Sequence, residues 1–168
     1  MADAGGNPRW LTSKQLQAWI RLVSVVELLP GALDSQLQRD AELTHFEYIA
    51  LSLMTDPAKQ TLRMSALASA TNATLARLSN VISRLEKRGF VVRSSCAIDR
   101  RAINVSLTES GRQKVVDSAP GHVAAVRDAV IDVLDEADIA DLHRIMGRIM
   151  ARLDPRDDLR TVNFARHN

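Results

Sequence analysis

The chain has 168 residues, of which 46% are apolar and 25% are charged, a composition typical of a folded globular protein. This length fits one domain with additional helices and excludes a chain that is disordered over most of its length. No stretch approaches the roughly 20 consecutive apolar residues of a membrane-spanning helix, and the N-terminus lacks the pattern of a secretion signal. A single cysteine, Cys96, excludes an internal disulfide, so we expect a cytoplasmic protein with no membrane partner.

Charge is distributed unevenly along the chain. Residues 63–112 hold nine basic and three acidic side chains, a net charge of +6, whereas the whole chain carries only +2. A basic middle between more acidic ends is typical of a nucleic-acid-binding module attached to a separate scaffold. An ordinary solvated basic surface explains the same pattern, so charge alone does not decide between the two interpretations.

The first part of the chain predicts two helices. Residues 12–15 form a capping-box sequence, and apolar residues then recur at helical spacing. Pro30 and Gly31 interrupt this run, which predicts a kink or a break in the first helix. A second capping-box sequence over 44–47 starts another helix, which we expect to end near Asp56 and Pro57.

Two shorter helices joined by a tight turn are predicted next. A hydroxyl residue suited to the N-cap position precedes each of them, and the turn contains an asparagine that tolerates left-handed backbone. A glycine follows the second helix, as is common just past a helix C-terminus. The expected elements are a candidate strand at 61–64, a helix over 66–70 capped by Ser65, a turn at 71–73 containing Asn72, and a helix over 75–88 capped by Thr74 and ended by Gly89.

A β-hairpin and a helical region follow. The expected elements are strands at 90–95 and 102–107, a helix capped by Thr108 that bends or breaks at Pro120 and Gly121, and a last helix capped by Asp135. The last helix carries apolar residues at alternating steps of three and four, a seam typical of one side of a helix–helix interface. The seam residues are Ile139, Leu142, Met146, Ile149 and Leu153. Residues 1–9 and 156–168 lack periodicity and are expected to be flexible.

The elements between residues 65 and 107 follow the order of a winged helix-turn-helix, whose second helix enters the DNA major groove. That helix needs two different faces, and the sequence supplies them. The apolar face is expected to hold Leu75, Leu78, Ile82 and Leu85, and the outward face Ala76, Arg77, Asn80, Ser83, Arg84 and Lys87. Arginine pairs well with guanine and asparagine with adenine. An amphipathic helix facing water has the same pattern, so this helix alone is not a specific signal.

The expected tip of the hairpin adds a second signal. It reads Asp99-Arg100-Arg101, two cations beside one acid. A basic ribbon tip fits the narrow minor groove, where arginine meets strong negative potential. We assign the groove-reaching role to Arg100 or Arg101, with Asp99 pairing with the other. The alternative is an exposed turn with incidental arginines.

Taken together, several short motifs resemble the MarR family of bacterial regulators. They are Leu67-Ala68, Thr74, the run Arg84-Leu85-Glu86-Lys87-Arg88-Gly89-Phe90-Val91, the triplet Asp99-Arg100-Arg101, and Leu107-Thr108-Glu109-Ser110-Gly111-Arg112. Each block is weak, but their order and spacing are specific, and the resemblance covers residues 10–153. Two further segments, at 10–12 and 119–122, resemble a subgroup frequent in actinobacteria.

The resemblance implies a mainly α-helical fold with a small β-hairpin wing. It implies a homodimer in which residues 10–43 and 109–153 form the helical dimerisation region and residues 44–108 form the winged helix-turn-helix DNA-binding domain. The implied partner is double-stranded DNA with a pseudo-palindromic operator. The implied DNA contacts are Thr74, Ala76, Arg77, Ser79, Asn80 and Arg84 in the recognition helix and Arg100 and Arg101 in the wing. The position of Asn80 is often basic in the family, so the base preference does not carry over.

The resemblance also implies regulation by a small molecule. Many relatives bind small aromatic or phenolic acids between the dimer scaffold and the DNA-binding lobe, and such a ligand acts through different affinities for two conformations. The candidate pocket residues are Trp19, Val23, His45, Tyr48, Ile49 and His122, for each of which ordinary packing is the competing explanation.

Two alternatives stay open. Cys96 at the base of the wing is a candidate oxidant sensor, although a lone cysteine is usually a packing residue. The same fold also serves protein-interaction modules that do not bind DNA. The sequence has no catalytic motif, no metal-ligand spacing among its four histidines and no nucleotide-binding loop, so we expect no enzyme activity, no metal and no cofactor.

Overall fold

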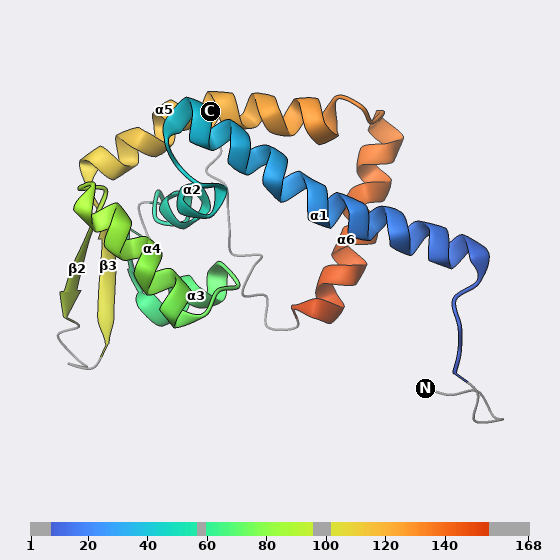
Figure 1. Cartoon of the computed structure of the whole chain (residues 1–168), viewed down its shortest axis with the longest axis horizontal. Coiled ribbons are helices and arrows are strands. Elements are labelled where there is room, and N and C mark those ends of the chain that lie inside the picture. Colours follow the sequence, from blue (N-terminus) through green and yellow to red (C-terminus); the bar gives the residue numbers. More distant parts are fainter. Residues whose placement is uncertain (1–7, 57–59, 96–101, 155–168) are drawn as a thin grey trace. The chain divides into compact units, whose positions relative to one another are not determined.

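The computed structural model describes residues 8–56, 60–95 and 102–154. The chain divides into two compact units, residues 1–32 and residues 33–168. Figure 1 shows a mainly helical chain with a small sheet. The elements are α1 (Ser13–Ala41), α2 (His45–Ser52), β1 (Thr61–Arg63), α3 (Met64–Ala70), α4 (Leu75–Lys87), β2 (Val91–Ser95), β3 (Ile103–Leu107), α5 (Glu109–Val126), the π-helix η2 (Arg127–Ile131) and α6 (Glu136–Leu153). The predicted fold class is confirmed.

Helix α1 begins as predicted and continues further than predicted. Thr12 and Gln15 exchange the two hydrogen bonds of a capping box. Of the kink or break predicted at Pro30, the break is wrong, because α1 runs through this residue to Ala41, and the kink stays a prediction. A proline in a helix interior costs about 3 kcal/mol, and burial of apolar side chains beyond it, such as Leu33 and Leu37, offsets that cost.

Most apolar side chains in the first part of α1 are exposed. Its length and composition are also those of a helix that can cross a membrane, a property that no other helix in the described ranges has. Arg21 and Glu27 lie within the same helix, however, and charged side chains are costly inside a bilayer. Exposed apolar surface on a long helix is equally typical of an interface between protein chains.

The core of the second unit forms around α2, α3 and α4. Thr44 and Glu47 form the predicted capping box at the start of α2. The prediction that Ser65 caps α3 is wrong, because α3 already begins at Met64 and its N-cap residue is Arg63. Met64 is buried and Arg63 is paired in β1, so the strand determines where the helix starts.

The turn before α4 and the end of α4 are as predicted. Asn72 and Gly89 both have positive φ, and the Thr74 side chain accepts a hydrogen bond from the backbone N–H of Arg77. The buried face of α4 differs from the prediction at two residues: Val81 is buried, at 5% exposed, and Leu75 is not, at 55% exposed. Leu75 is the first residue of the helix and lines a surface hollow with Ile103 instead of entering the core.

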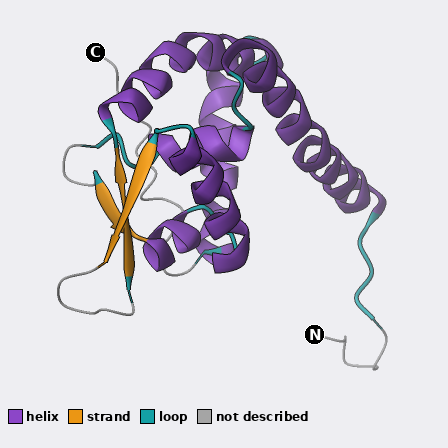
Figure 2. Ribbon diagram, turned by 60° about the vertical axis from the view of Figure 1, so that its left-hand side comes forward, coloured by secondary structure: helices purple, strands orange, loops and turns teal. Residues whose placement is uncertain are grey.

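The sheet has three strands in the order β1-β3-β2, all antiparallel, as Figure 2 shows beside the helices. The predicted hairpin is therefore extended by β1, which pairs Leu62 with Val105. Gly111, in the first turn of α5, lies directly against the loop before β2. A Cβ atom at this position would lie 2.1 Å from the carbonyl oxygen of Phe90 and 2.8 Å from Leu107. Only glycine permits this close approach.

Helix α5 is continuous at the position where a bend or a break was predicted, which excludes the break and leaves the bend as a prediction. Helix α5 begins at the predicted Thr108 cap and runs through Pro120 to Val126, so the break predicted at Pro120 and Gly121 is wrong. Buried Ser118 and His122 flank the proline and hold the helix in place. The chain instead leaves the helix after η2, and Asp135 caps α6 as predicted.

Candidate DNA interface and effector cavity

Helix α4 buries one face and exposes the other. The buried side chains are Leu78, Val81, Ile82 and Leu85. The opposite face is polar, and its exposed residues are Ala76, Arg77, Asn80, Arg84 and Lys87, with Ser79 and Ser83 half-buried. Thr74 lies at the N-cap, where helix N–H groups favour an anion such as phosphate. The structure thus brings all six predicted recognition-helix residues together on one element.

Arg77 contacts the first turn of α2. Its guanidinium carbon lies 4.4 Å from the centre of the Phe46 ring, a cation–π contact. Arg77, Asn80 and Arg84 also line one shallow hollow together with Asp34. This contact with Phe46 was not predicted, because no sequence pattern relates two residues thirty positions apart.

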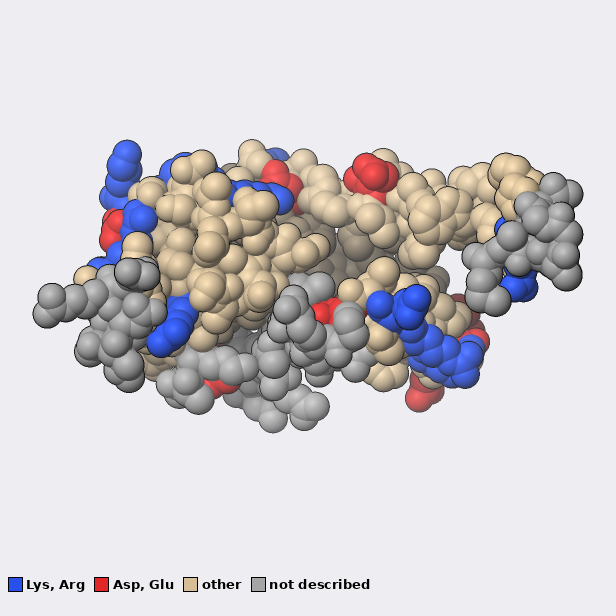
Figure 3. Space-filling model, turned by 90° about the horizontal axis from the view of Figure 1, so that it is seen from below, with Lys and Arg blue, Asp and Glu red and all other residues tan. Residues whose placement is uncertain are grey.

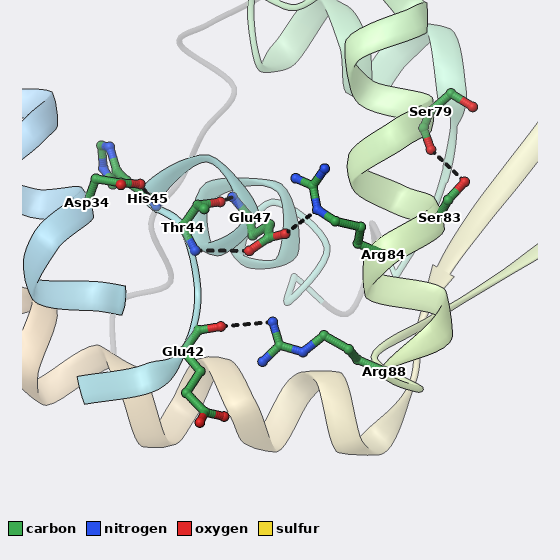
Figure 4. A network of polar contacts seen from close by, with 9 residues as sticks. All are labelled: Asp34, Glu42, Thr44, His45, Glu47, Ser79, Ser83, Arg84 and Arg88. Atoms are coloured by element: carbon green, nitrogen blue, oxygen red, sulfur yellow. Dashed lines mark hydrogen bonds and ion pairs between the residues drawn. The ribbon is translucent and has the colours of Figure 1, made fainter. Parts of the chain in front are cut away.

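Arg84 is paired with an acid. Its Nε donates to Oε1 of Glu47 at 3.2 Å, and the Glu47 side chain is only 6% exposed whereas that of Arg84 is 56% exposed. Figure 4 shows Arg84 reaching from α4 toward the start of α2. Nearby, Nη1 of Arg88 donates to the backbone oxygen of Glu42 at 2.8 Å. Arg84 in α4 and Arg88 at its C-cap are therefore held by contacts within the protein.

A third arginine ties the wing to the recognition helix. Arg93 in β2 donates from its backbone N–H and its Nε to the carboxylate of Glu86, at 3.0 and 2.9 Å, and from Nη2 to the hydroxyl of Ser83 at 2.6 Å. These hydrogen bonds hold the pKa of the Glu86 carboxyl below its ordinary value. Sequence reasoning counted Arg93 only as a positive charge, whereas the structure gives it a role in orienting β2 on α4.

The predicted wing residues Asp99, Arg100 and Arg101, and Cys96, lie outside the described residues. In the view of Figure 3, the described lysines and arginines (blue) on the second unit lie in separate groups.

A cavity of about 410 Å³ lies in the second unit between α2, α5 and η2. Its lining is mostly apolar, with hydroxyl, imidazole and guanidinium groups among the side chains. The lining residues are Tyr48, Ser52, Thr55, Val115, Ala119, His122, Val123, Val126, Arg127 and Ile131. Most of the α5 and η2 lining was missed by the sequence analysis, because its valines and isoleucine have the same pattern as core residues.

Two of the six predicted effector-pocket residues line this cavity, Tyr48 and His122. Ile49 instead packs against the hydrophobic core. Trp19, which is exposed, and Val23, which is half-buried, belong to the first unit.

The remaining predicted residue, His45, belongs to a small aromatic cluster. The ring centre of His122 lies 4.6 Å from that of Tyr48 and 5.6 Å from that of His45. His122 is buried, and its Nδ1 has no hydrogen-bond partner in the described part of the chain. Burial lowers the pKa of both imidazoles and raises that of the Tyr48 phenol. At neutral pH the cluster is therefore uncharged.

Comparison with known proteins agrees with this architecture. The MarR family model matches residues 47–103. The structure of Sco3205, a MarR family transcriptional regulator from Streptomyces coelicolor in complex with DNA, is 39% identical and has a TM-score of 0.83, over 88% of this chain and 93% of that one. AbsC from the same organism is 36% identical with a TM-score of 0.80, over 87% and 98%. YdcH of Bacillus subtilis, an HTH-type transcriptional regulator, is 28% identical over 116 residues, 68% of this chain and 71% of that protein.

The helix-turn-helix, the three-stranded wing and the polar outer face of α4 define a DNA-binding transcriptional regulator. The identity and coverage shared with the Streptomyces proteins are too high for a likeness of fold alone. The chain belongs to the MarR family.

The buried imidazoles predict a pH-dependent stability. Because the folded-state pKa of His45 and His122 is below the ordinary value of 6.5, the unfolded chain binds more protons just below that pH. The free energy of unfolding should therefore decrease as the pH falls below about 6.5. Replacing His122 with Phe keeps an aromatic ring but removes one titrating group, so the loss between pH 7.5 and pH 5.5 should be smaller. Urea unfolding at fixed protein concentration measures this, and an equal loss in both proteins would contradict it.

Proposed function

We propose that this regulator binds a pseudo-palindromic operator in the cytoplasm as a homodimer, and that a small aromatic or phenolic effector releases it. The observation that carries the proposal is the exposed polar face of α4, which lies opposite the buried face that fixes the helix in the lobe. The relative Sco3205 was solved in complex with DNA, which supports the same use of this surface here.

The proposed contacts divide along α4. A recognition helix uses its N-terminal part for base edges, so Ala76, Arg77 and Asn80 are assigned to bases. Ala76 permits close approach, and Asn80 can form paired hydrogen bonds with adenine. Thr74, Ser79 and Arg84 are assigned to phosphate or base contacts at the margins. Arg100 and Arg101 are assigned to the minor groove, with Asp99 orienting the wing tip.

The proposed dimer uses apolar surface that one chain leaves exposed. In α1 this surface includes Leu16, Trp19, Ile20, Val25 and Val26. Helix α6 has no buried residue, and its predicted seam is half-buried at most positions. Contiguous apolar surface of this kind marks interfaces in soluble proteins. We assign residues 10–43 and 109–153 to dimerisation.

The proposed effector site is the cavity between α2, α5 and η2. A volume of about 410 Å³ suits a small ligand, and an apolar lining with few polar groups is typical of such sites. Arg127, whose Nη2 donates to Asp132, has further N–H donors for a carboxylate, and the free Nδ1 of His122 offers a hydrogen bond to a hydroxyl group. These groups favour an aromatic acid that carries a hydroxyl.

DNA binding by the arginines is testable with a duplex selected from a random pool by the native protein. Replacing Arg77 with Ala should weaken binding to this duplex about tenfold, as expected for loss of a charged hydrogen bond. Replacing Arg100 and Arg101 together should weaken binding and flatten its salt dependence, because fewer counterions are released. Fluorescence anisotropy at several salt concentrations measures both effects. If the native protein shows no salt-sensitive binding, a protein-interaction module becomes the better explanation of the fold.

The dimer is testable through α6. Native protein at micromolar concentration should sediment at twice its chain mass of 18.5 kDa. Replacing Leu142 and Ile149 with Glu should produce monomers, because charges would then lie within an apolar seam. Ala140 faces away from this seam by helical geometry, so Ala140→Glu is the matched control. A monomeric native protein, or a seam variant that stays dimeric, would contradict the assignment.

The effector cavity is testable by filling it. Salicylate, used as a probe at millimolar concentration, should release the native protein from its selected duplex. Ala119→Trp places a large ring in the cavity and should abolish this response while DNA binding is retained. Gln113→Trp, at an exposed position of the same helix, should respond like the native protein. Release of the Ala119→Trp variant at the same salicylate concentration would rule out this cavity.

A further inference from the structure

The ion pair between Arg84 and Glu47 links the recognition helix to the first turn of α2. The contact is made by Nε of Arg84, at 3.2 Å from Oε1 of Glu47. Figure 4 shows the two terminal nitrogens of Arg84 directed away from this carboxylate. The guanidinium is therefore held by one edge, and more than half of the side chain stays accessible to solvent.

Glu47 is itself fixed in place. Its Oε2 accepts the backbone N–H of Thr44 at 2.9 Å, and its own backbone N–H donates to the Thr44 hydroxyl at 3.1 Å. These are the two bonds of the capping box, so the carboxylate cannot turn away without opening the start of α2. Because this carboxylate is almost fully buried, loss of its cationic partner would leave a desolvated charge. Both groups therefore favour a single geometry.

The position of Arg84 along α4 indicates which part of DNA it meets. It lies about 13 Å along the helix axis from Leu75, at a rise of about 1.5 Å per residue. Base edges are contacted mainly from the N-terminal part of a recognition helix. Arg84 is therefore close to the sugar-phosphate backbone when the start of α4 lies in the major groove. A guanidinium with a free fork of N–H donors matches a phosphate well.

We propose that Glu47 is a positioning residue that turns Arg84 into a phosphate clamp. This inference rests on the proposed use of α4 in DNA binding. It adds that Arg84 contacts phosphate while the N-terminal part of α4 contacts bases. Glu47 holds the Nε edge of Arg84 before DNA arrives, so the fork does not have to be ordered on binding. Arg84 then contributes affinity without base specificity. Arg77 differs, because it rests on an uncharged ring and not on a fixed acceptor.

Substituting Glu47 separates this role from simple charge repulsion. Glu47→Gln removes a negative charge near the DNA, and repulsion alone would make binding tighter. Thr44 and Arg84 donate to different oxygens of Glu47, however, so in Gln one of these two donors would face the side-chain NH2 group instead of an acceptor. Positioning therefore predicts weaker binding, by about three- to tenfold, a loss in the range of a typical hydrogen bond. Thr44→Ala is the matched control, because it opens the other half of the capping box without removing the acceptor of Arg84.

The experiment measures anisotropy of the selected duplex and of a scrambled duplex at several salt concentrations. Arg84→Ala should weaken binding to both duplexes by the same factor and reduce the salt slope by about 0.9, the value for one phosphate contact. Glu47→Gln alone should weaken binding to both duplexes. In a protein that already carries Arg84→Ala, adding Glu47→Gln should not weaken binding further. Thr44→Ala should change affinity less than twofold. Melting temperatures show whether each variant is folded.

The outcomes separate this inference from the proposed function. If the native protein binds neither duplex, the proposed function fails and the inference fails with it. If the native protein binds but Glu47→Gln binds as tightly or more tightly, only the positioning role is overturned. A loss confined to the selected duplex would make Arg84 a base-reading residue and would also overturn it. If Glu47→Gln does not fold, Arg84→Lys replaces it: Lys keeps the charge without the fork, so undiminished affinity would overturn the clamp.

Discussion

The arrangement of this molecule depends on burial of one face of α4. Leu78, Ile82 and Leu85 are fully enclosed by the core of the second unit, and Val81 is nearly so. Burying one such side chain stabilises a protein by roughly 1.5–3 kcal/mol, so rotating α4 about its axis would be very costly. The orientation of the opposite face follows from this constraint. The side chains proposed to contact DNA are thus oriented by the buried side chains on the opposite face of the helix.

Polar contacts, in addition to the buried core, hold α4 against the neighbouring elements. Arg84 and Arg77 rest on the first turn of α2, and Arg93 joins β2 to α4 through Glu86. Partly exposed ion pairs such as that of Arg93 commonly contribute less than about 1 kcal/mol to stability, whereas the pair of Arg84 involves the buried carboxylate of Glu47. The importance of all three contacts here is geometric, because each links two elements that both border the proposed DNA interface. The side chains of the proposed DNA interface therefore lie on elements, α2, α4 and β2, that are linked to one another.

Local features were predictable from the sequence, and long-range ones were not. The caps at Thr44, Thr74, Thr108 and Asp135 and the positive φ of Asn72 follow from residue chemistry within a few positions, and all are confirmed. The breaks expected at Pro30 and Pro120 were wrong, because tertiary packing outweighs a local helix penalty. The start of α3 was misplaced for a similar reason, since strand pairing and not a side-chain cap determines it.

In the candidate site, too, local features were predictable from the sequence and long-range contacts were not. Membership of the polar face of α4 was predictable from helical periodicity, whereas the partners of its arginines lie thirty or more positions away. The cavity was found only in part, because a valine that lines a cavity and a valine in the core give the same sequence pattern. The exposure of Leu75 shows that periodicity identifies a helix face but not where along the helix the core ends.

The contact at Gly111 has a mechanical consequence. With no side chain there, the first turn of α5 touches the Phe90 carbonyl directly, and β2 follows immediately after that residue. The end of α4, the base of the wing and the start of α5 therefore move as one body. The α-helical hydrogen-bond ladder of α5 is interrupted only further along, at Pro120, which lacks a backbone donor, and it is replaced after Val126 by the wider turns of η2. The first turn of α5 is thus tied to the wing, and the irregular backbone lies at a distance from it.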